Sequence, residues 1–375
     1  MAAIPFFDAR AGYEELAGEL DAAALRVLRS GAYILGEEVA AFERAFAAYC
    51  GAAHCVGVGN GLDALTLILR ALGVGPGDEV VVPGHTFIAT WLAVSAVGAI
   101  PVPVEPDPRT YNVTTDGVER ALGPRTKAVV CVHLHGRLVD AGPLAELCRG
   151  RGIPLVEDAA QAHGATGPAG RAGSLADAAA FSFYPTKNLG AYGDGGAVTT
   201  SHGWLAERVA LLRNYGSRRK YDHQEVGVNS RLDPLQAALL GVRLAHLDTM
   251  NARRRALVEC YLERLDGVPG LKLPAPAGED HVWHVLAVLA EDRDRVQAAL
   301  SAAGIGTLVH YPIPPHRSGA YARDGAPVAS LPVTEDLCAR GLSLPLFPQL
   351  APAAVDAVCE AVRAASRSRS ALPAR

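Results

Sequence analysis

The sequence has no excess of positive charge, no long hydrophobic run and no closely paired cysteines. Lysine and arginine number 35 against 39 acidic residues, a net charge of −4, so the chain lacks the basic field that nucleic acid or an anionic membrane requires. Apolar runs such as "VVCVHLHG" fall far short of the ~20 residues that a membrane-spanning helix needs. The first ten residues have no basic stretch followed by a hydrophobic one, so we expect no secretory signal.

Cysteine usage bears on both metal binding and location. Seven cysteines without a C-x-x-C pair argue against a disulfide framework or a structural zinc site and favour the reducing cytoplasm. His133 and His135 in "VHLHG" are expected to share one face of a strand, which is a geometry that metals use. No third histidine or acidic ligand is near in sequence, so packing at the end of a strand is the favoured interpretation and we predict no metal.

Half of the residues are hydrophobic, and their pattern predicts an α/β protein. Residues 14–50 have helical spacing of apolar positions, and strands then alternate with helices as far as residue 200. This alternation predicts a mostly parallel central sheet covered by helices on both faces. Residues 233–265 are helical over more positions than is usual for one helix, so we expect two helices or one kinked helix here.

That long helical segment is expected to lead into a smaller α/β domain. This smaller domain includes a predicted strand at 306–312 and a final helix at 351–366. We therefore predict a large domain over residues 1–245, with a helical segment at its N-terminus, and a small C-terminal domain over 246–375.

Three stretches lie at carboxyl ends of predicted strands, where open α/β sheets bind ligands. The first, "GVGNGLDAL" (57–65), runs from a strand through glycines into a helix, which suits either a phosphate cradle or a structural turn. A dinucleotide fingerprint would have a third glycine where this chain has Leu62, so that interpretation is weak.

The other two stretches carry a carboxylate and an amine. Asp158 ends the strand in "IPLVEDAAQ" and would need a cationic partner to stay ionised; its alternative role is a helix N-cap. Lys187 follows the strand in "FSFYPTKN", where burial would leave a neutral amine able to form a Schiff base; its alternative is a snorkelling lysine at a strand edge. A phosphate cradle, a carboxylate and such a lysine together indicate pyridoxal phosphate.

Several motifs, in order, resemble the DegT/DnrJ/EryC1/StrS family of sugar aminotransferases. They are "VEDAAQAHGA", "FSFYPTKNLGAYGDGGAVTT" and "GVNSRLDPLQAALL", and the similarity extends from "GEEVAAFERAFAAYCG" to "VHYPIPPH". The resemblance implies the aspartate aminotransferase fold, type I of the pyridoxal-phosphate enzymes.

The resemblance also implies roles for individual residues. Lys187 matches the Schiff-base lysine and Asp158 the partner of the pyridinium nitrogen. The other implied contacts with the cofactor are Gln161 with the ring hydroxyl, Phe87 stacked on the ring, Ser182 and the backbone amides of Leu62 and Asp63 with the phosphate, and Asn229 with the phosphate of the neighbouring subunit. Many relatives have threonine in place of Leu62, so a hydroxyl contact is lost. The glycines after Lys187 are expected to let the backbone pass close to the ring.

The substrate contacts implied by the resemblance lie in three segments. Lys220 and Tyr221 in the basic loop "GSRRKYD" match residues that contact the nucleotide diphosphate, whereas Arg218 and Arg219 are equally well explained as solvated. His310 and Tyr311 match a position that faces the sugar, and Tyr184 is expected to line the same pocket.

The implied activity is transfer of an amino group, with glutamate as donor, to a nucleotide-linked keto-6-deoxyhexose in a homodimer with shared active sites. The enzyme would alternate between pyridoxal and pyridoxamine phosphate. The motifs are most similar to members that aminate C3 of a dTDP-sugar, since those that aminate C4 of dTDP- or UDP-sugars more often have histidine at the position of Tyr184.

Two further alternatives belong to other functional classes. A relative that dehydrates the sugar would have histidine in place of Lys187, and a non-catalytic cofactor-binding homologue could keep the lysine. The composition, rich in alanine and arginine, suggests a GC-rich genome and deoxysugars of secondary metabolism.

Overall fold

A seven-stranded sheet forms the centre of the computed structural model, which describes residues 3–322 and 330–367. Its strands lie in the order β1-β9-β8-β5-β4-β2-β3, and only β9 runs against the others. The bounds are β1 His54–Val58, β2 Glu79–Pro83, β3 Ile100–Val104, β4 Thr126–Val132, β5 Leu155–Asp158, β8 Ala178–Ser182 and β9 Gly196–Thr200. The mostly parallel sheet predicted from the alternating pattern is confirmed.

Alternating side chains divide the large sheet into two buried faces. In β4, Ala128 and Val130 belong to one core, and Val129 and Cys131 belong to another on the opposite side. The first core is covered by α3 Gly61–Ala71, α4 Ala89–Ala96 and α7 Gly203–Leu212. The second face is covered by α2 Glu37–Cys50, α5 Thr115–Ala121 and α6 Ala141–Gly150, with a short hairpin of β6 Thr166–Gly167 and β7 Gly170–Arg171.

The helical region expected over 14–50 is two helices. The first, α1, covers Ala9–Ser30, and α2 begins at Glu37. Gly31 and Gly36 between them have φ angles of 70° and 90°, in the left-handed region that a continuous helix excludes. These glycines end one helix and begin the next.

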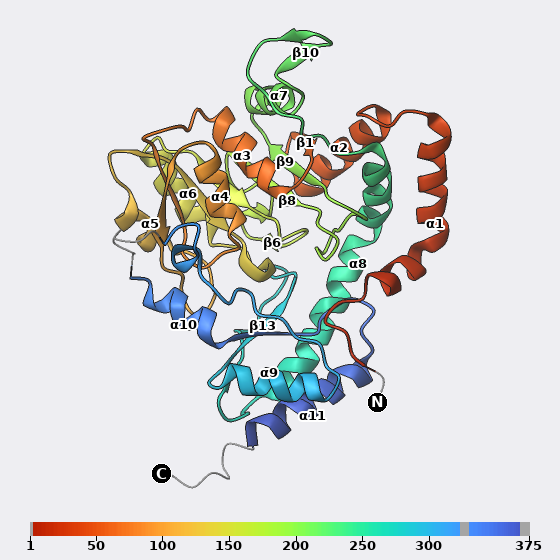
Figure 1. Ribbon diagram of the computed structural model, residues 1–375, viewed down its shortest axis with the longest axis vertical. Helices are drawn as coiled ribbons and strands as arrows, with labels where there is room; N and C mark the ends of the chain where they lie inside the picture. The colour runs from red at the N-terminus through yellow and green to blue at the C-terminus, as the bar shows by residue number, and fades with distance from the viewer. Residues whose placement is uncertain (1–2, 323–329, 368–375) are drawn as a thin grey trace.

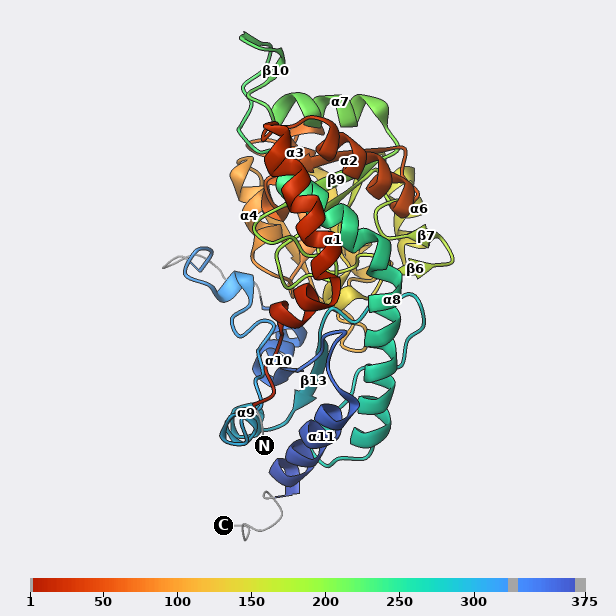
Figure 2. The same cartoon turned by 90° about the vertical axis from the view of Figure 1, so that its right-hand side faces the viewer.

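A single helix, α8 (Pro234–Leu265), occupies the segment where two helices or one kinked helix were expected, and it bends along its length in both ribbon views (Figures 1 and 2). It runs from the large sheet to the lower part of the molecule in both ribbon views (Figures 1 and 2). Near its start Ala237 and Leu240 pack in a core beside the large sheet, and near its end Leu257 and Tyr261 pack in a separate core. One helix therefore contributes to both cores.

The core at the end of α8 surrounds a small antiparallel sheet. Helices α9 Arg293–Ala302 and α11 Pro352–Arg367 pack against this sheet, and α10 Pro332–Arg340 lies beside it. The strands are β12 Leu271–Lys272, β13 Leu286–Ala290 and β14 Gly341–Leu344. The strand predicted at 306–312 is absent: Leu308 makes one bridge to Ser343, and the amide of Gly306 donates to the carbonyl of Ile4 at 2.8 Å. The segment therefore pairs at single residues with two different neighbours and forms no regular strand.

A hairpin of β10 Ser217–Arg219 and β11 Asp222–His223 extends beyond α7, away from the rest of the molecule (Figures 1 and 2). Two 3-10 turns, Leu134–Gly136 and Pro315–Arg317, complete the regular structure over the described ranges. Over the same ranges, no helix combines the length and apolar character needed to cross a membrane.

Candidate active site

The loop after β8 holds Lys187 from two sides. The Lys187 amide donates to the carbonyl of Tyr184 at 2.8 Å, which closes a turn. The side-chain amide of the next residue, Asn188, donates to Asn251 Oδ1 on α8 at 2.8 Å and to the carbonyl of Val282 at 2.9 Å. The lysine backbone is thus anchored between the large sheet, α8 and the segment that leads to the small sheet.

The side chain of Lys187 is partly buried and bears an amine of lowered basicity. Burial lowers its pKa from 10.5 to about 8, and the negative charge of Asp158 opposes this effect. Within residues 3–322 and 330–367, no hydrogen bond or ion pair holds its Nζ atom. The neutral form of this amine, whose fraction grows as the pH approaches 8, is a nucleophile.

Asp158 is the last residue of β5, and its carboxylate is buried. Thr90 Oγ1 donates to Oδ2 at 2.8 Å, and the amide of Ala160 donates to Oδ1 at 3.2 Å. Burial raises the pKa of Asp158, whereas these two bonds and the charge of Lys187 oppose the rise. No helix begins after Asp158, so its alternative role as a helix N-cap is wrong.

The neighbouring acid, Glu157, points to the other face of the sheet and has a different role. Its oxygens accept bonds from the amides of Gly173 and Leu175, each at 2.8 Å, and from His133 Nε2 at 2.9 Å. His133 follows the end of β4, and His135 lies in a 3-10 turn with φ 59°, so the two histidines do not share a strand face as expected. In the part of the chain that the structure describes, no cluster of three possible metal ligands occurs.

The predicted phosphate turn brings the start of α3 against Ser182. A Cβ at Gly61 would lie 2.7 Å from the Cβ of Ser182, so only glycine permits this approach. Asn60 caps α3, and its Oδ1 accepts from the amide of Asp63 at 2.8 Å. The Asp63 amide thus already points at an acceptor oxygen, whereas the Leu62 amide has no hydrogen bond to the described residues.

The glycines after Lys187 allow close contact between chain segments. A Cβ at Gly196 would lie 2.5 Å from the carbonyl of Asn60, in the phosphate turn, and one at Gly190 would lie 2.4 Å from the carbonyl of Pro185. Gly196 therefore lets β9 approach the predicted cradle.

Gln161 joins the two parts of the molecule through Tyr311. The amide of His135 donates to Gln161 Oε1 at 2.6 Å, so the Nε2 group is free to donate and contacts the Tyr311 hydroxyl at 2.9 Å. The Phe87 ring, 52% exposed, lies with its centroid 5.3 Å from that of Tyr311. Three predicted residues from distant segments thus meet.

His310 and Tyr184 border the same region. His310 Nδ1 lies 2.8 Å from Ser343 Oγ on β14. Burial, and to a smaller extent the charge of Lys187, lowers the pKa of His310 to about 4, so the ring is neutral at neutral pH. Tyr184 is exposed and precedes Lys187 by one turn.

Three predicted residues lie away from this group in the single chain. Lys220 and Tyr221 connect the strands of the projecting hairpin, with the lysine Nζ 5.2 Å from the tyrosine ring centroid, and Tyr221 is 83% exposed. Asn229 is exposed and forms a bridge with Asn214, while the hydroxyl of the next residue, Ser230, donates to Asp63 Oδ2 at 2.6 Å.

Sequence reasoning missed Thr90 and Asn60, which hold Asp158 and Asp63. Thr90 lies in "HTFIAT", three residues after Phe87, but only the packing of α4 on the sheet brings its hydroxyl to β5. Asn60 had a local signal, because asparagine before a helix is a preferred N-cap.

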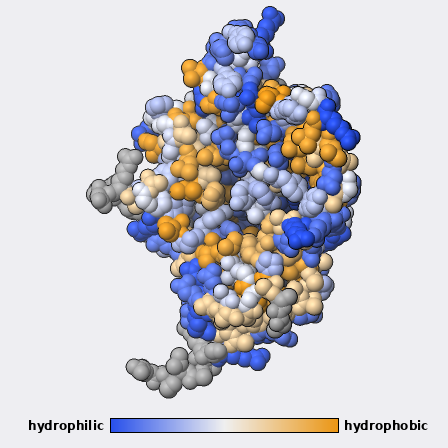
Figure 3. All heavy atoms as spheres, turned by 45° about the vertical axis from the view of Figure 1, so that its right-hand side comes forward, coloured by the Kyte–Doolittle hydropathy of each residue, from blue (hydrophilic) through white to orange (hydrophobic). Residues whose placement is uncertain are grey.

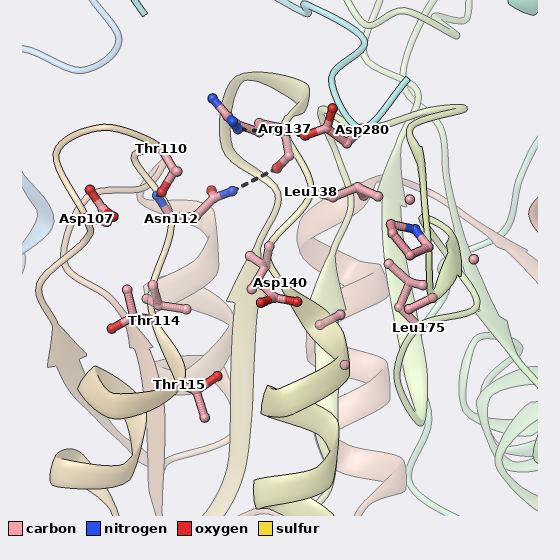
Figure 4. A pocket seen from close by; sticks show the side chains of 18 residues that line it. Asp107, Thr110, Asn112, Thr114, Thr115, Arg137, Leu138, Asp140, Leu175 and Asp280 are labelled. Carbon is pink, nitrogen blue, oxygen red and sulfur yellow. Dashed lines mark hydrogen bonds and ion pairs between the residues drawn. The ribbon is translucent and has the colours of Figure 1, made fainter. Parts of the chain in front are cut away.

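A separate cavity of about 540 Å³ lies beside the starts of α5 and α6 (Figure 4). Asn112 Nδ2 donates there to the carbonyl of Arg137 at 2.9 Å, and the Arg137 guanidinium lies 3.9 Å from Asp280. None of the predicted site residues lines this cavity, so it is distinct from the group around Lys187.

Comparison with known proteins identifies relatives along nearly the whole chain. The model of the DegT/DnrJ/EryC1/StrS aminotransferase family matches residues 14–363. A dTDP-3-amino-3,4,6-trideoxy-alpha-D-glucose transaminase from Streptomyces venezuelae is 54% identical over 361 residues, which are 96% of this chain and 95% of that protein.

Solved structures show the same fold. The crystal structure of S. venezuelae DesV in complex with a ketimine intermediate superimposes with a TM-score of 0.95 at 53% identity, covering 98% of this chain and 99% of the other. The structure of NtdA from Bacillus subtilis with bound cofactor PMP gives a TM-score of 0.92 at 29% identity, covering 98% and 86%. The predicted fold class is confirmed.

Proposed function

This chain belongs to the DegT/DnrJ/EryC1/StrS aminotransferase family, and from that membership we propose that it transfers amino groups with pyridoxal phosphate. The observation that carries the proposal is the pairing at the carboxyl edge of the large sheet. Lys187 there has an unengaged amine with a pKa lowered to about 8, and Asp158 has a buried carboxylate that interacts with it.

The residues present fit this cofactor. The close approach of Gly61 to Ser182 leaves helix N-terminal amides for a phosphate, and the spare donor of Gln161 suits a ring hydroxyl. Lys187 would hold the aldehyde carbon, Asp158 the ring nitrogen and Phe87 one face of the ring. Ser182 and the unbonded amide of Leu62 would hold the phosphate, and the amide of Asp63, which donates to Asn60 Oδ1 in this structure, would join them by exchanging that acceptor for a phosphate oxygen. When bound, the cofactor supplies an aldehyde for amines and a protonated ring that takes up electron density.

The chain's own groups then bind, orient and move protons. At a pKa of about 8, Lys187 Nζ both accepts and returns a proton near neutral pH. Asp158 keeps a negative charge fixed at the strand end, while Gln161 is oriented by the amide of His135. Tyr311, partly buried and bonded to Gln161, borders one side of the site.

For the acceptor we propose a dTDP-linked 3-keto-6-deoxyhexose, aminated at C3, with glutamate as donor. The S. venezuelae relative is named for a 3-amino dTDP-sugar, and the identity to it extends over 96% of this chain. Tyr184, exposed beside Lys187, and the neutral ring of His310 are the proposed contacts with the sugar.

We further propose a homodimer with shared sites, in the cytoplasm. Lys220 and Tyr221 lie on a projecting hairpin, where a single chain gives them no site, and Asn229 is exposed at its base. Apolar side chains are exposed on and after the last turns of α1, including Leu28 and Ile34. Figure 3 shows apolar patches over the upper part of the face that includes α1. A second copy would cover such patches and receive the hairpin.

A half-reaction screen tests the proposal. Protein loaded with pyridoxamine phosphate is mixed with dTDP- and UDP-linked sugars that carry a keto group at C3 or at C4, and the absorbance of the pyridoxal form is followed. We expect the fastest return with a dTDP-3-keto sugar and none in Lys187→Ala. Faster return with a 4-keto sugar would overturn the C3 assignment, and no return with any keto sugar would contradict the activity.

A further inference from the structure

Two threonine hydroxyls form a chain that ends on Asp158. Thr90 Oγ1 lies 2.8 Å from Asp158 Oδ2, and Thr86 Oγ1 lies 2.9 Å from Thr90 Oγ1. Both threonines are buried, at 1% and 2% exposure. An ionised carboxylate only accepts hydrogen bonds, so Thr90 must donate to it and is left to accept from Thr86. The direction of both bonds is therefore fixed by the charge at the end of the chain.

This use of a helical threonine is unlike the usual one. Threonines inside helices commonly bond to a carbonyl of the preceding turn, as Thr66 does with Leu62 at 2.9 Å. Thr90 instead donates from α4 to the carboxylate of Asp158 on β5, which replaces the carbonyl as acceptor. Thr86, four residues earlier, donates to the Thr90 hydroxyl. This arrangement leaves neither the donor nor the acceptor of the Thr90 hydroxyl without a partner, because the hydroxyl donates to Asp158 and accepts from Thr86.

Asp158 depends on this bond more than on its other contacts. Burial raises the pKa of Asp158, and among the groups that oppose the rise the Thr90 bond has the largest effect, followed by the amide of Ala160 and the charge of Lys187. The charge of His133, which is hydrogen-bonded to Glu157 after the end of β4, has a smaller effect in the same direction. Among the described residues, Cys131 on β4 and the hydroxyl of Tyr311 also interact with the charge of Asp158.

We propose that Thr90, polarised by Thr86, is a positioning residue that keeps the Asp158 carboxylate charged and in one orientation, and so sustains its pairing with the ring nitrogen of the cofactor. The inference rests on the proposed role of Asp158. A charge-assisted bond inside a water-poor site is stronger than one between neutral groups, and a second hydroxyl in the chain strengthens the first.

The test compares variants that retain shape or chemistry. Thr90→Val removes the hydroxyl at nearly constant volume, Thr90→Ser restores it, and Thr86→Val removes only the outer bond. Thr199→Val is the matched control, because Thr199 is equally buried but donates to the carbonyl of Gly173 at 2.8 Å. Each variant is assayed for the half-reaction with glutamate across pH, for the pH at which the absorbance of bound cofactor changes, and for its melting temperature.

We expect Thr90→Val to slow the half-reaction about ten- to a hundredfold at neutral pH, the loss of one hydrogen bond to a charged group. The acidic limb of its pH profile and the spectral transition should move together, the limb to higher pH because Asp158 becomes easier to protonate. Thr86→Val should move both less in the same direction, Thr90→Ser should restore both, and Thr199→Val should move neither.

Four results would overturn the role proposed for Thr90. A Thr90→Val protein with a lower melting temperature but unchanged pH profile and spectral transition would make Thr90 purely structural and overturn the inference. If Thr90→Val does not fold, an unshifted Thr86→Val profile overturns it in the same way. When Asp158→Asn is slow and Thr90→Val is not, only the role of Thr90 fails; a fast Asp158→Asn would remove the role of Asp158 and that of Thr90 with it.

Discussion

Replacing Asp158 with asparagine removes one negative charge from the site and changes little else. The asparagine oxygen can still accept from Thr90 or from the amide of Ala160, which now lie 2.8 and 3.2 Å from the carboxylate. The side chain keeps its volume at the end of β5, and the groups proposed to bind phosphate are untouched. The protein should therefore fold and bind cofactor, and the loss should appear in proton transfer.

The size of the effect follows from the burial of Asp158. Opposite charges about 4 Å apart attract by about 4 kcal/mol at an effective dielectric constant of about 20. Since about 1.4 kcal/mol corresponds to a factor of ten, each half-reaction should slow about a thousandfold. Stopped-flow absorbance with glutamate, and separately with the keto sugar, measures the two rates.

Glu157→Gln is the matched control, one residue earlier on the opposite face of the same strand. Glu157 accepts three hydrogen bonds, from Gly173, Leu175 and His133, and a glutamine would turn an amide group toward one of these donors. The free energy of unfolding should fall by about 2–3 kcal/mol while the half-reaction rates stay near those of the parent. Near-parental rates in Asp158→Asn, or a thousandfold loss in Glu157→Gln, would refute the reasoning.

Four further predictions concern the cofactor and the second subunit. Borohydride should fix the cofactor on Lys187, and a peptide map with the label elsewhere would contradict the assignment. Because burial lowers the pKa of Lys187 to about 8, capture of pyridoxal phosphate by cofactor-free protein should speed up with rising pH and level off above about 8; a rise that continues to pH 10 would indicate a normal lysine. Gly61→Ala should weaken cofactor binding measured by absorbance titration, because the new Cβ would lie 2.7 Å from Ser182. Finally, mixing Lys187→Ala with Asn229→Ala subunits should restore activity, and continued inactivity after proven subunit exchange would contradict shared sites.

The strand-end residues of the site could be predicted because their signals are local. A lone lysine after an apolar strand and an acid at the end of another indicate Lys187 and Asp158 without any knowledge of packing. Thr90 could not be found this way, since its role depends on which face α4 lies on. The roles of Glu157 and Asp158 separate only when the sheet assigns them opposite faces.

The elements of the fold with a local sequence signal could also be predicted, whereas those that depend on distant segments could not. The period of apolar residues indicated the parallel sheet, but it did not locate the break between α1 and α2, which depends on the left-handed backbone at Gly31 and Gly36. At 306–312 isolated pairings replace the expected strand: Gly306 bonds to the N-terminal segment and Leu308 pairs with Ser343. The N-terminal partner is about three hundred residues away along the chain, outside any local pattern.

The unbroken course of α8 sets the mechanics of the whole chain. At 1.5 Å per residue its 32 residues form a helix about 48 Å long along its axis, fixed at one end by Leu240 and at the other by Tyr261. Unfolding the core at either end would expose the apolar face of that half of α8 to water. The helix would then fray from that end, and the other core would lose part of the helix against which it packs. Heat should therefore unfold the protein in one calorimetric transition, because neither core can lose its part of α8 without the other.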